Sequence, residues 1–153
     1  MISNVHLNMV KRINPENLSS KQKENYHFHK QAAVLADYGF NCIKLSDDWE
    51  GADFLAHSNE ITLKVQLKSR TTIAKKYISK DLYMLFPLDD KDVNSDWCLI
   101  KHDILMELIA NKLHWLNTTS WIKDGIYNSS KAPKGILPEL QKYILKGQDT
   151  LIL

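Results

Sequence analysis

Cysteine and long apolar runs are scarce in this sequence, and each scarcity excludes a class of protein. The 153 residues include only two cysteines, Cys42 and Cys98, which is too few for a disulfide-stapled secreted fold or a cysteine-ligated zinc site. No apolar run approaches the ~20 residues that a membrane-spanning helix needs. Residues 1–6 also lack the apolar segment of a signal peptide. We therefore expect an intracellular protein that is neither a membrane protein nor a zinc finger.

Positive charge comes almost entirely from lysine, because Arg12 and Arg70 are the only arginines and the formal net charge is +2. Acidic residues gather in the runs 47–53 and 89–92, apart from the lysine clusters. A nearly neutral total is compatible with a basic face opposite an acidic pocket, although solvated surface charge is the common alternative. A hydrophobic content of 44% favours a folded chain, and the length favours a single domain over residues 1–153.

Hydrophobic periodicity predicts an α/β or α+β protein. A helix is expected over residues 20–38, because Ser19 and Gln22 have capping-box spacing and Gly39 is placed to end it. Strands are expected over 40–45, 52–56, 61–68, 82–86 and 97–101. A second helix should start at Asp103, a hairpin should turn at 124–125, and a last helix should lie between Pro138 and Gly147. Residues 1–18 read as a loosely attached arm.

The expected strand 61–68 carries the residues that indicate chemistry. Its side chains alternate between apolar and polar, so Gln66 and Lys68 share the polar face. If the segment 52–56 pairs with this strand, Asp53 comes within reach of both. A carboxylate from Asp53, an amide oxygen from Gln66 and the main-chain carbonyl of Leu67 form a hard oxygen set suited to Mg²⁺. Lys68 would then orient or deprotonate a water beside the metal.

These residues resemble a known family. The run Gly51-Ala52-Asp53-Phe54, a polar turn, and then Val65-Gln66-Leu67-Lys68 are similar to the core of the PD-(D/E)XK nuclease superfamily. Glutamine occupies the second acidic position, as in some members. The resemblance covers about residues 19–86, and the small size and the run 64–70 look most like small bacterial intron-encoded homing endonucleases.

The resemblance implies a restriction-endonuclease-like mixed sheet flanked by helices, to which the turn and helix signals add a C-terminal hairpin and helix extension. It implies Mg²⁺-dependent, sequence-specific hydrolysis of double-stranded DNA by a protein that forms dimers or tetramers. We expect this protein to be bacterial and cytoplasmic, and to associate with the nucleoid when it is bound to DNA. Asp53 and Gln66 would be metal ligands and Lys68 the catalytic lysine. We expect residues 19–101 to form the catalytic core and residues 102–153 to serve oligomerisation and DNA contact.

Further residues are candidates for supporting roles. Glu24 on the first helix is a possible helper, although a solvated helix residue is the common alternative. Lysines and hydroxyl groups beside a metal site are suited to holding phosphates. The expected DNA-binding residues are Ser69, Arg70, Lys75, Lys76, Lys123, Lys131 and Lys134.

Other functions remain open at this point. A restriction or repair endonuclease of the same fold would carry the same residues. A non-catalytic DNA-binding module is the second alternative, because Gln66 leaves the site one negative charge short. A protein-interaction domain with merely solvated lysines is the third.

Overall fold

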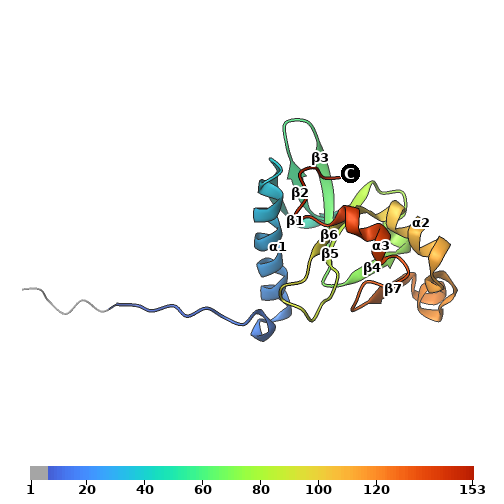
Figure 1. The fold of residues 1–153 in the computed structure, drawn as a ribbon, viewed down its shortest axis with the longest axis horizontal. Coiled ribbons are helices and arrows are strands. Elements are labelled where there is room, and N and C mark those ends of the chain that lie inside the picture. Colours follow the sequence, from blue (N-terminus) through green and yellow to red (C-terminus); the bar gives the residue numbers. More distant parts are fainter. Residues whose placement is uncertain (1–6) are drawn as a thin grey trace, which may run out of the picture.

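A computed structural model describes residues 7–153 and shows a mixed sheet flanked by helices (Figure 1). The main sheet has five strands in the order β1-β2-β3-β5-β6. Only β3 and β5 pair in parallel, and the other neighbours are antiparallel. The expected mixture of helix and strand is therefore confirmed. The strands are β1 (Asn41–Trp49), β2 (Ala52–His57), β3 (Thr62–Leu67), β5 (Leu82–Pro87) and β6 (Trp97–Lys101).

Helix α1 (Ser20–Ala36) covers one face of this sheet. It begins with the predicted capping box, in which Ser19 Oγ accepts from the Gln22 N–H at 3.3 Å and Gln22 Oε1 accepts from the Ser19 N–H at 2.9 Å. Phe28 and Leu35 on α1 are buried with residues of β2, β3, β5 and β6 in one apolar core. The predicted first helix is confirmed, although it ends at Ala36.

The other face is covered by α2 (His102–Lys112), α3 (Leu137–Leu140) and a two-stranded sheet. The small sheet pairs β4 (Thr71–Ala74) with β7 (Ile126–Ser129) in antiparallel fashion. His102 at the start of α2 fastens this sheet, because its Nε2 accepts from the Ala74 N–H at 3.1 Å. A second apolar core joins these elements to β5 and β6.

The hairpin predicted at Asp124–Gly125 is wrong. Residues Ser120–Asp124 form a short π-helical turn, and Gly125, at φ +68°, ends it in the left-handed conformation typical of a helix C-cap. The strand after Gly125 pairs with the distant β4 instead of folding back on residues 121–122. The last helix is also shorter than predicted, because α3 passes into a 3₁₀ turn over Gln141–Tyr143 well before Gly147.

A large bulge in β1 lies opposite Asp53, the first residue of the predicted metal site. Lys44 pairs with Phe54 and Trp49 pairs with Ala52, so four residues of β1 stand against the single residue Asp53. The hairpin then closes through Glu50 and Gly51, both with positive φ. Bulges of this kind redirect side chains next to functional sites.

Residues 7–14 are exposed and extend away from the body of the molecule, as expected for an arm (Figure 1). A 3₁₀ turn over Pro15–Asn17 leads from this arm into α1.

Within the described residues, no helix is long and apolar enough to cross a membrane.

The tight packing at Gly51 generates a stability prediction. Gly39 and Gly51 both have strongly positive φ, but a Cβ on Gly39 would meet nothing within 4 Å, whereas one on Gly51 would lie 2.9 Å from Cδ1 of Tyr77. Gly39→Ala should lower the free energy of unfolding by about 1 kcal/mol from backbone strain alone. Gly51→Ala should cost about 2–4 kcal/mol because overpacking adds to that strain. Urea denaturation of both variants tests this, and equal losses would contradict the close packing of Gly51 on Tyr77.

Candidate active site

The pairing of β2 with β3 brings Asp53 and Gln66 together. Phe54 pairs with Val65, and continuing this register by one residue places Asp53 opposite Gln66, on the same face of the sheet. The predicted pairing of these two segments is confirmed. Asp53 Oδ2 also accepts a hydrogen bond from the Leu67 N–H at 2.9 Å, so the carboxylate is fixed against the end of β3.

Three oxygen-bearing groups converge at this point. The Gln66 side chain is only 7% exposed, and its Nε2 donates to the Leu67 carbonyl at 3.4 Å. Rotating that amide end for end would present its oxygen at the same place. With the Asp53 carboxylate bound to the Leu67 N–H, the residues present fit the oxygen set that Mg²⁺ prefers.

The donor set contains a single well-placed carboxylate. Across residues 7–153, no group of three or more His, Cys, Asp or Glu side chains is arranged to hold a metal ion. A cation held by Asp53, neutral oxygens and water would use a mode that Mg²⁺ tolerates, because Mg²⁺ keeps several of its waters.

Lys68 lies beside these groups at the end of β3. Its N–H donates to the Leu85 carbonyl at 2.9 Å, which extends the parallel pairing with β5 and fixes the backbone. Burial lowers the pKa of the Lys68 ammonium group, and the nearby charge of Lys76 lowers it further, while Asp53 and Asp48 act in the opposite direction. The site thus holds a partly desolvated lysine next to a carboxylate.

The Asp53 carboxylate is held in an unfavourable environment for its charge. Burial raises the pKa of Asp53, against the lowering effect of the Leu67 hydrogen bond, and the neighbouring charges of Glu24 and Asp48 raise it further. Glu24 comes from α1 and Asp48 from the β1 bulge. Glu24 is close enough to influence Asp53, but its carboxylate is paired with Lys21 at 3.5 Å, and its role as a helper stays a prediction.

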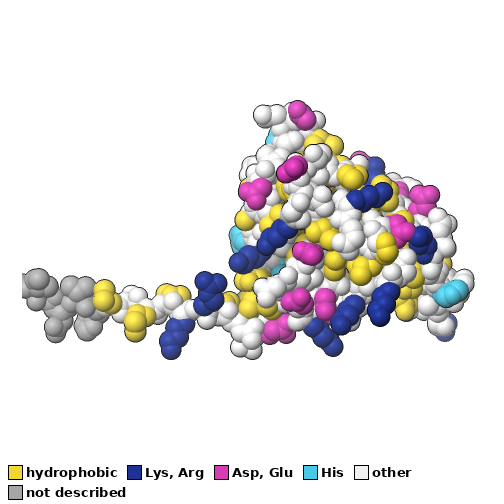
Figure 2. Space-filling view, in the orientation of Figure 1, with side chains coloured by type: hydrophobic (Ala, Val, Ile, Leu, Met, Phe, Trp, Pro, Cys, Tyr) yellow, Lys and Arg dark blue, Asp and Glu magenta, His cyan; other side chains and the backbone are white. Residues whose placement is uncertain are grey.

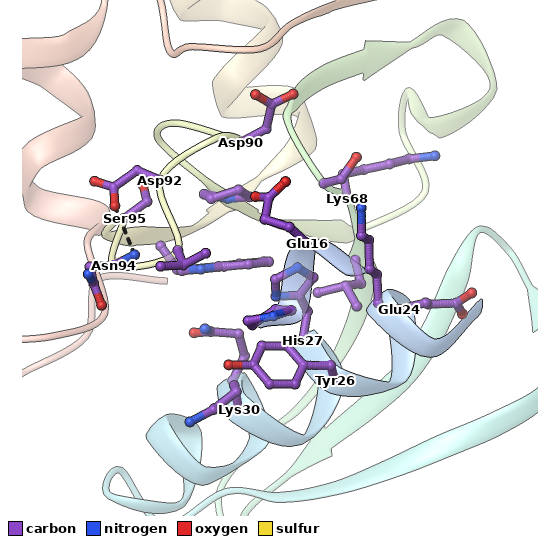
Figure 3. Close-up of a pocket in the computed structure, with 18 of the residues that line it drawn as sticks. Glu16, Glu24, Tyr26, His27, Lys30, Lys68, Asp90, Asp92, Asn94 and Ser95 are labelled. Carbon is purple, nitrogen blue, oxygen red and sulfur yellow. Dashed lines mark hydrogen bonds between the residues drawn. The ribbon is translucent and has the colours of Figure 1, made fainter. Parts of the chain in front are cut away.

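A cleft of about 1400 Å³ opens in front of these residues and is lined in part by residues 10–13, at the end of the arm nearest to α1. Figure 3 shows α1 forming one wall, with Glu24, His27 and Lys30, and the loop between β5 and β6 facing it. The lining includes both charges: Lys23, Lys30, Lys68 and Arg70, but also Glu24, Asp53, Asp89 and Asp90. Basic and acidic side chains are likewise intermingled on the face drawn in Figure 2. The charged side chains of the cleft are therefore of mixed sign.

The predicted DNA-binding residues divide into two groups. Ser69 and Arg70 line the cleft, and Arg70 is held by Asp90, at 2.6 Å, and by Asn128, at 3.3 Å. Lys75, Lys76, Lys123, Lys131 and Lys134 are exposed outside it. Lys131 lies 3.7 Å from Asp89. Arg70 is thus committed to an internal ion pair, whereas most of the lysines face solvent.

Two further residues lie near the site, although the sequence favoured an acidic surface loop for Asp48 and only a general phosphate contact for the segment that contains Tyr77. Tyr77 is buried beside Lys68, and the charge of Asp48 acts on both Asp53 and Lys68. The residues 71–74 form β4, a β-prone run that could have been recognised as a strand. No local pattern indicates the β1 bulge that moves Asp48 toward Asp53.

In comparisons with known proteins, the chain matches no family model and no curated protein, so these comparisons assign it to no family.

Removing the buried charge of Asp53 should stabilise the metal-free protein at neutral pH. Because its pKa is raised by folding, Asp53 favours the folded state below its unfolded pKa, and that contribution is lost as pH rises through the folded value. Asp53→Asn keeps an oxygen acceptor for the Leu67 N–H, so we expect a higher Tm at pH 7 without divalent cations and a gain that disappears in acid. Calorimetry at pH 3 to 8 measures this, with the exposed Asp149→Asn as control. A lower Tm at pH 7 would contradict the prediction.

Proposed function

We propose that this protein is a Mg²⁺-dependent, sequence-specific endonuclease of double-stranded DNA, most like a homing endonuclease of the PD-(D/E)XK type. The observation that carries the proposal is the convergence of Asp53, Gln66 and the Leu67 backbone with Lys68, where β2 starts and β3 ends. The same residues would serve a restriction or repair endonuclease, since those differ in biological context rather than in the site.

The cation would be held by Asp53, Gln66 and the Leu67 carbonyl. When bound, Mg²⁺ supplies positive charge that stabilises a phosphate under attack and makes its bound water more acidic. The burial that raises the pKa of Asp53 supports this role, because a carboxylate kept partly dehydrated gains more from a cation than an exposed one.

Lys68 has the position and the environment to handle the attacking water. Its lowered pKa makes the ammonium group easier to deprotonate than that of a solvated lysine. In its neutral form the amine can accept a proton from water, and in its charged form it can donate a hydrogen bond to a phosphate oxygen. Either role requires it to remain beside Asp53, where the β3–β5 pairing fixes its backbone.

Residues 7–153 carry one such site, so cleavage of both strands of a duplex predicts a symmetric oligomer. A dimer or tetramer would present the same constellation to each strand. The helix α2 and the segments after it remain the proposed place for oligomer and DNA contacts.

A cleavage assay on a mixed library of duplex DNA, with and without Mg²⁺, tests the proposal. Lys68→Ala should slow cleavage by about 10²–10⁴-fold, and Asp53→Ala should abolish it, while both variants retain DNA binding. Lys142→Ala, an exposed lysine in a 3₁₀ turn far along the chain, is the control. Wild-type rates in either site variant would overturn the assignment.

Gln66 is uncharged and leaves the site one negative charge short, which favours a second candidate function: a DNA-binding module that does not cleave. A metal titration distinguishes this module from an endonuclease. Mg²⁺ at ten times its Kd should stabilise the wild-type protein by about 1.4 kcal/mol, and Gln66→Glu should bind Mg²⁺ more tightly. Asp53→Asn should show no such stabilisation. DNA binding without Mg²⁺ stabilisation or cleavage would instead favour the binding module.

A further inference from the structure

Tyr77 occupies the centre of a tightly packed group next to the proposed site. It is only 2% exposed, and its ring makes an edge-to-face contact with His102 at 5.6 Å between centroids. A Cβ on Gly51 would lie within 3.0 Å of two of its ring carbons, Cδ1 and Cε1. The ring therefore has little freedom to move, since the β1–β2 turn and α2 hold it.

Two lysine side chains approach this one ring. The Nζ atom of Lys68 lies 5.7 Å from the ring centroid, and that of Lys76 lies 5.2 Å from it. Both distances are within the range of cation–π attraction. In the part of the chain that the structure describes, neither ammonium group forms an ion pair with a carboxylate within 4.0 Å.

We propose that Tyr77 is a positioning residue whose ring holds Lys68 and Lys76 as a pair of ammonium groups that bind adjacent backbone phosphates of one DNA strand. Lys68 would face the phosphate that is cleaved, and Lys76, which is exposed, would face a neighbouring one. The inference deepens the proposed function and rests on it.

The charge arrangement supports a polyanionic ligand. Two like charges near one ring repel each other, and because no carboxylate of the described residues lies within ion-pair distance of either, an anion from outside relieves that repulsion further. A DNA strand presents one negative charge per nucleotide, so two lysines on a rigid support match a repeating phosphate backbone. Lys142 makes the same kind of contact alone, with its Nζ atom 5.4 Å from the centroid of the Tyr143 ring.

The Lys76 part of the proposal is tested by DNA binding, without any cleavage. Lys76→Gln should make the slope of log affinity against log salt shallower by about 1, because one phosphate contact is lost. Lys142→Gln removes the same charge from the same type of lysine–tyrosine contact and should leave the slope unchanged. This arm does not depend on folding effects, because Lys76 is exposed.

The Tyr77 part is tested by comparing Tyr77→Phe with Tyr77→Leu. Phe keeps the ring and should retain the wild-type kcat, whereas Leu removes the ring and should lower kcat by about 10- to 100-fold with little change in KM, because Lys68 is then misplaced. NMR provides a readout independent of activity: the ε-methylene signals of Lys68 and Lys76 should lose their ring-current shifts in Tyr77→Leu and keep them in Tyr77→Phe.

The outcomes separate this inference from the function on which it rests. A wild-type protein that neither binds nor cleaves DNA would overturn both. Wild-type cleavage together with an unchanged salt slope in Lys76→Gln would overturn the phosphate pair alone. An equal loss of kcat in Tyr77→Phe and Tyr77→Leu would overturn the role of the ring, because the hydroxyl group would then be responsible.

Discussion

The hydrogen bond from the Leu67 N–H to Asp53 Oδ2 is the constraint on which the site depends. It joins the start of β2 to the end of β3 at the point where β1 no longer pairs regularly with β2. Burial and two acidic neighbours destabilise the charged carboxylate, so without this bond the Asp53 side chain would be more stable turned toward solvent. The bond fixes the carboxylate next to Gln66 and Lys68, and it offsets part of the cost of burying charge.

The rest of the fold supplies rigidity around that bond. One apolar core fastens α1 to the sheet, and another fastens α2, α3 and the small β4–β7 sheet to the opposite face. The site lies between these two bodies of packing, with α1 on one side and Tyr77 on the other. Side chains held in this way are positioned by the scaffold rather than by their own flexibility.

Much of this arrangement could be predicted from local sequence. The capping box at Ser19, the alternation of residues 61–68 and the polar turn before them specify α1, β3 and the β2–β3 hairpin, and with them the proximity of Asp53 to Gln66. These features depend on periodicity and on short-range pairing, which a single sequence displays directly. The functional roles of these residues remain predictions.

The parts that failed depend on distant segments. The turn at Gly125 has the residues of a hairpin, but the strand after it pairs with β4, about fifty residues earlier in the chain. That pairing places Ile126 and Tyr127 against the apolar core that contains Ile73. Similarly, nothing near Tyr77 in the sequence indicates that Gly51 and His102 enclose its ring. Such contacts arise from tertiary packing, which overrides local preference.

The bulge in β1 also affects whether copies of the protein associate through the edges of their sheets. β1 is an outer strand of the main sheet, and an outer strand with a regular, unpaired row of N–H and C=O groups is a template for edge-to-edge aggregation. The four residues opposite Asp53 break that row, and two of them, Asp47 and Asp48, carry negative charge. The irregularity beside the proposed site therefore also protects the sheet edge, so that straightening β1 to improve its pairing would favour fibrous self-association.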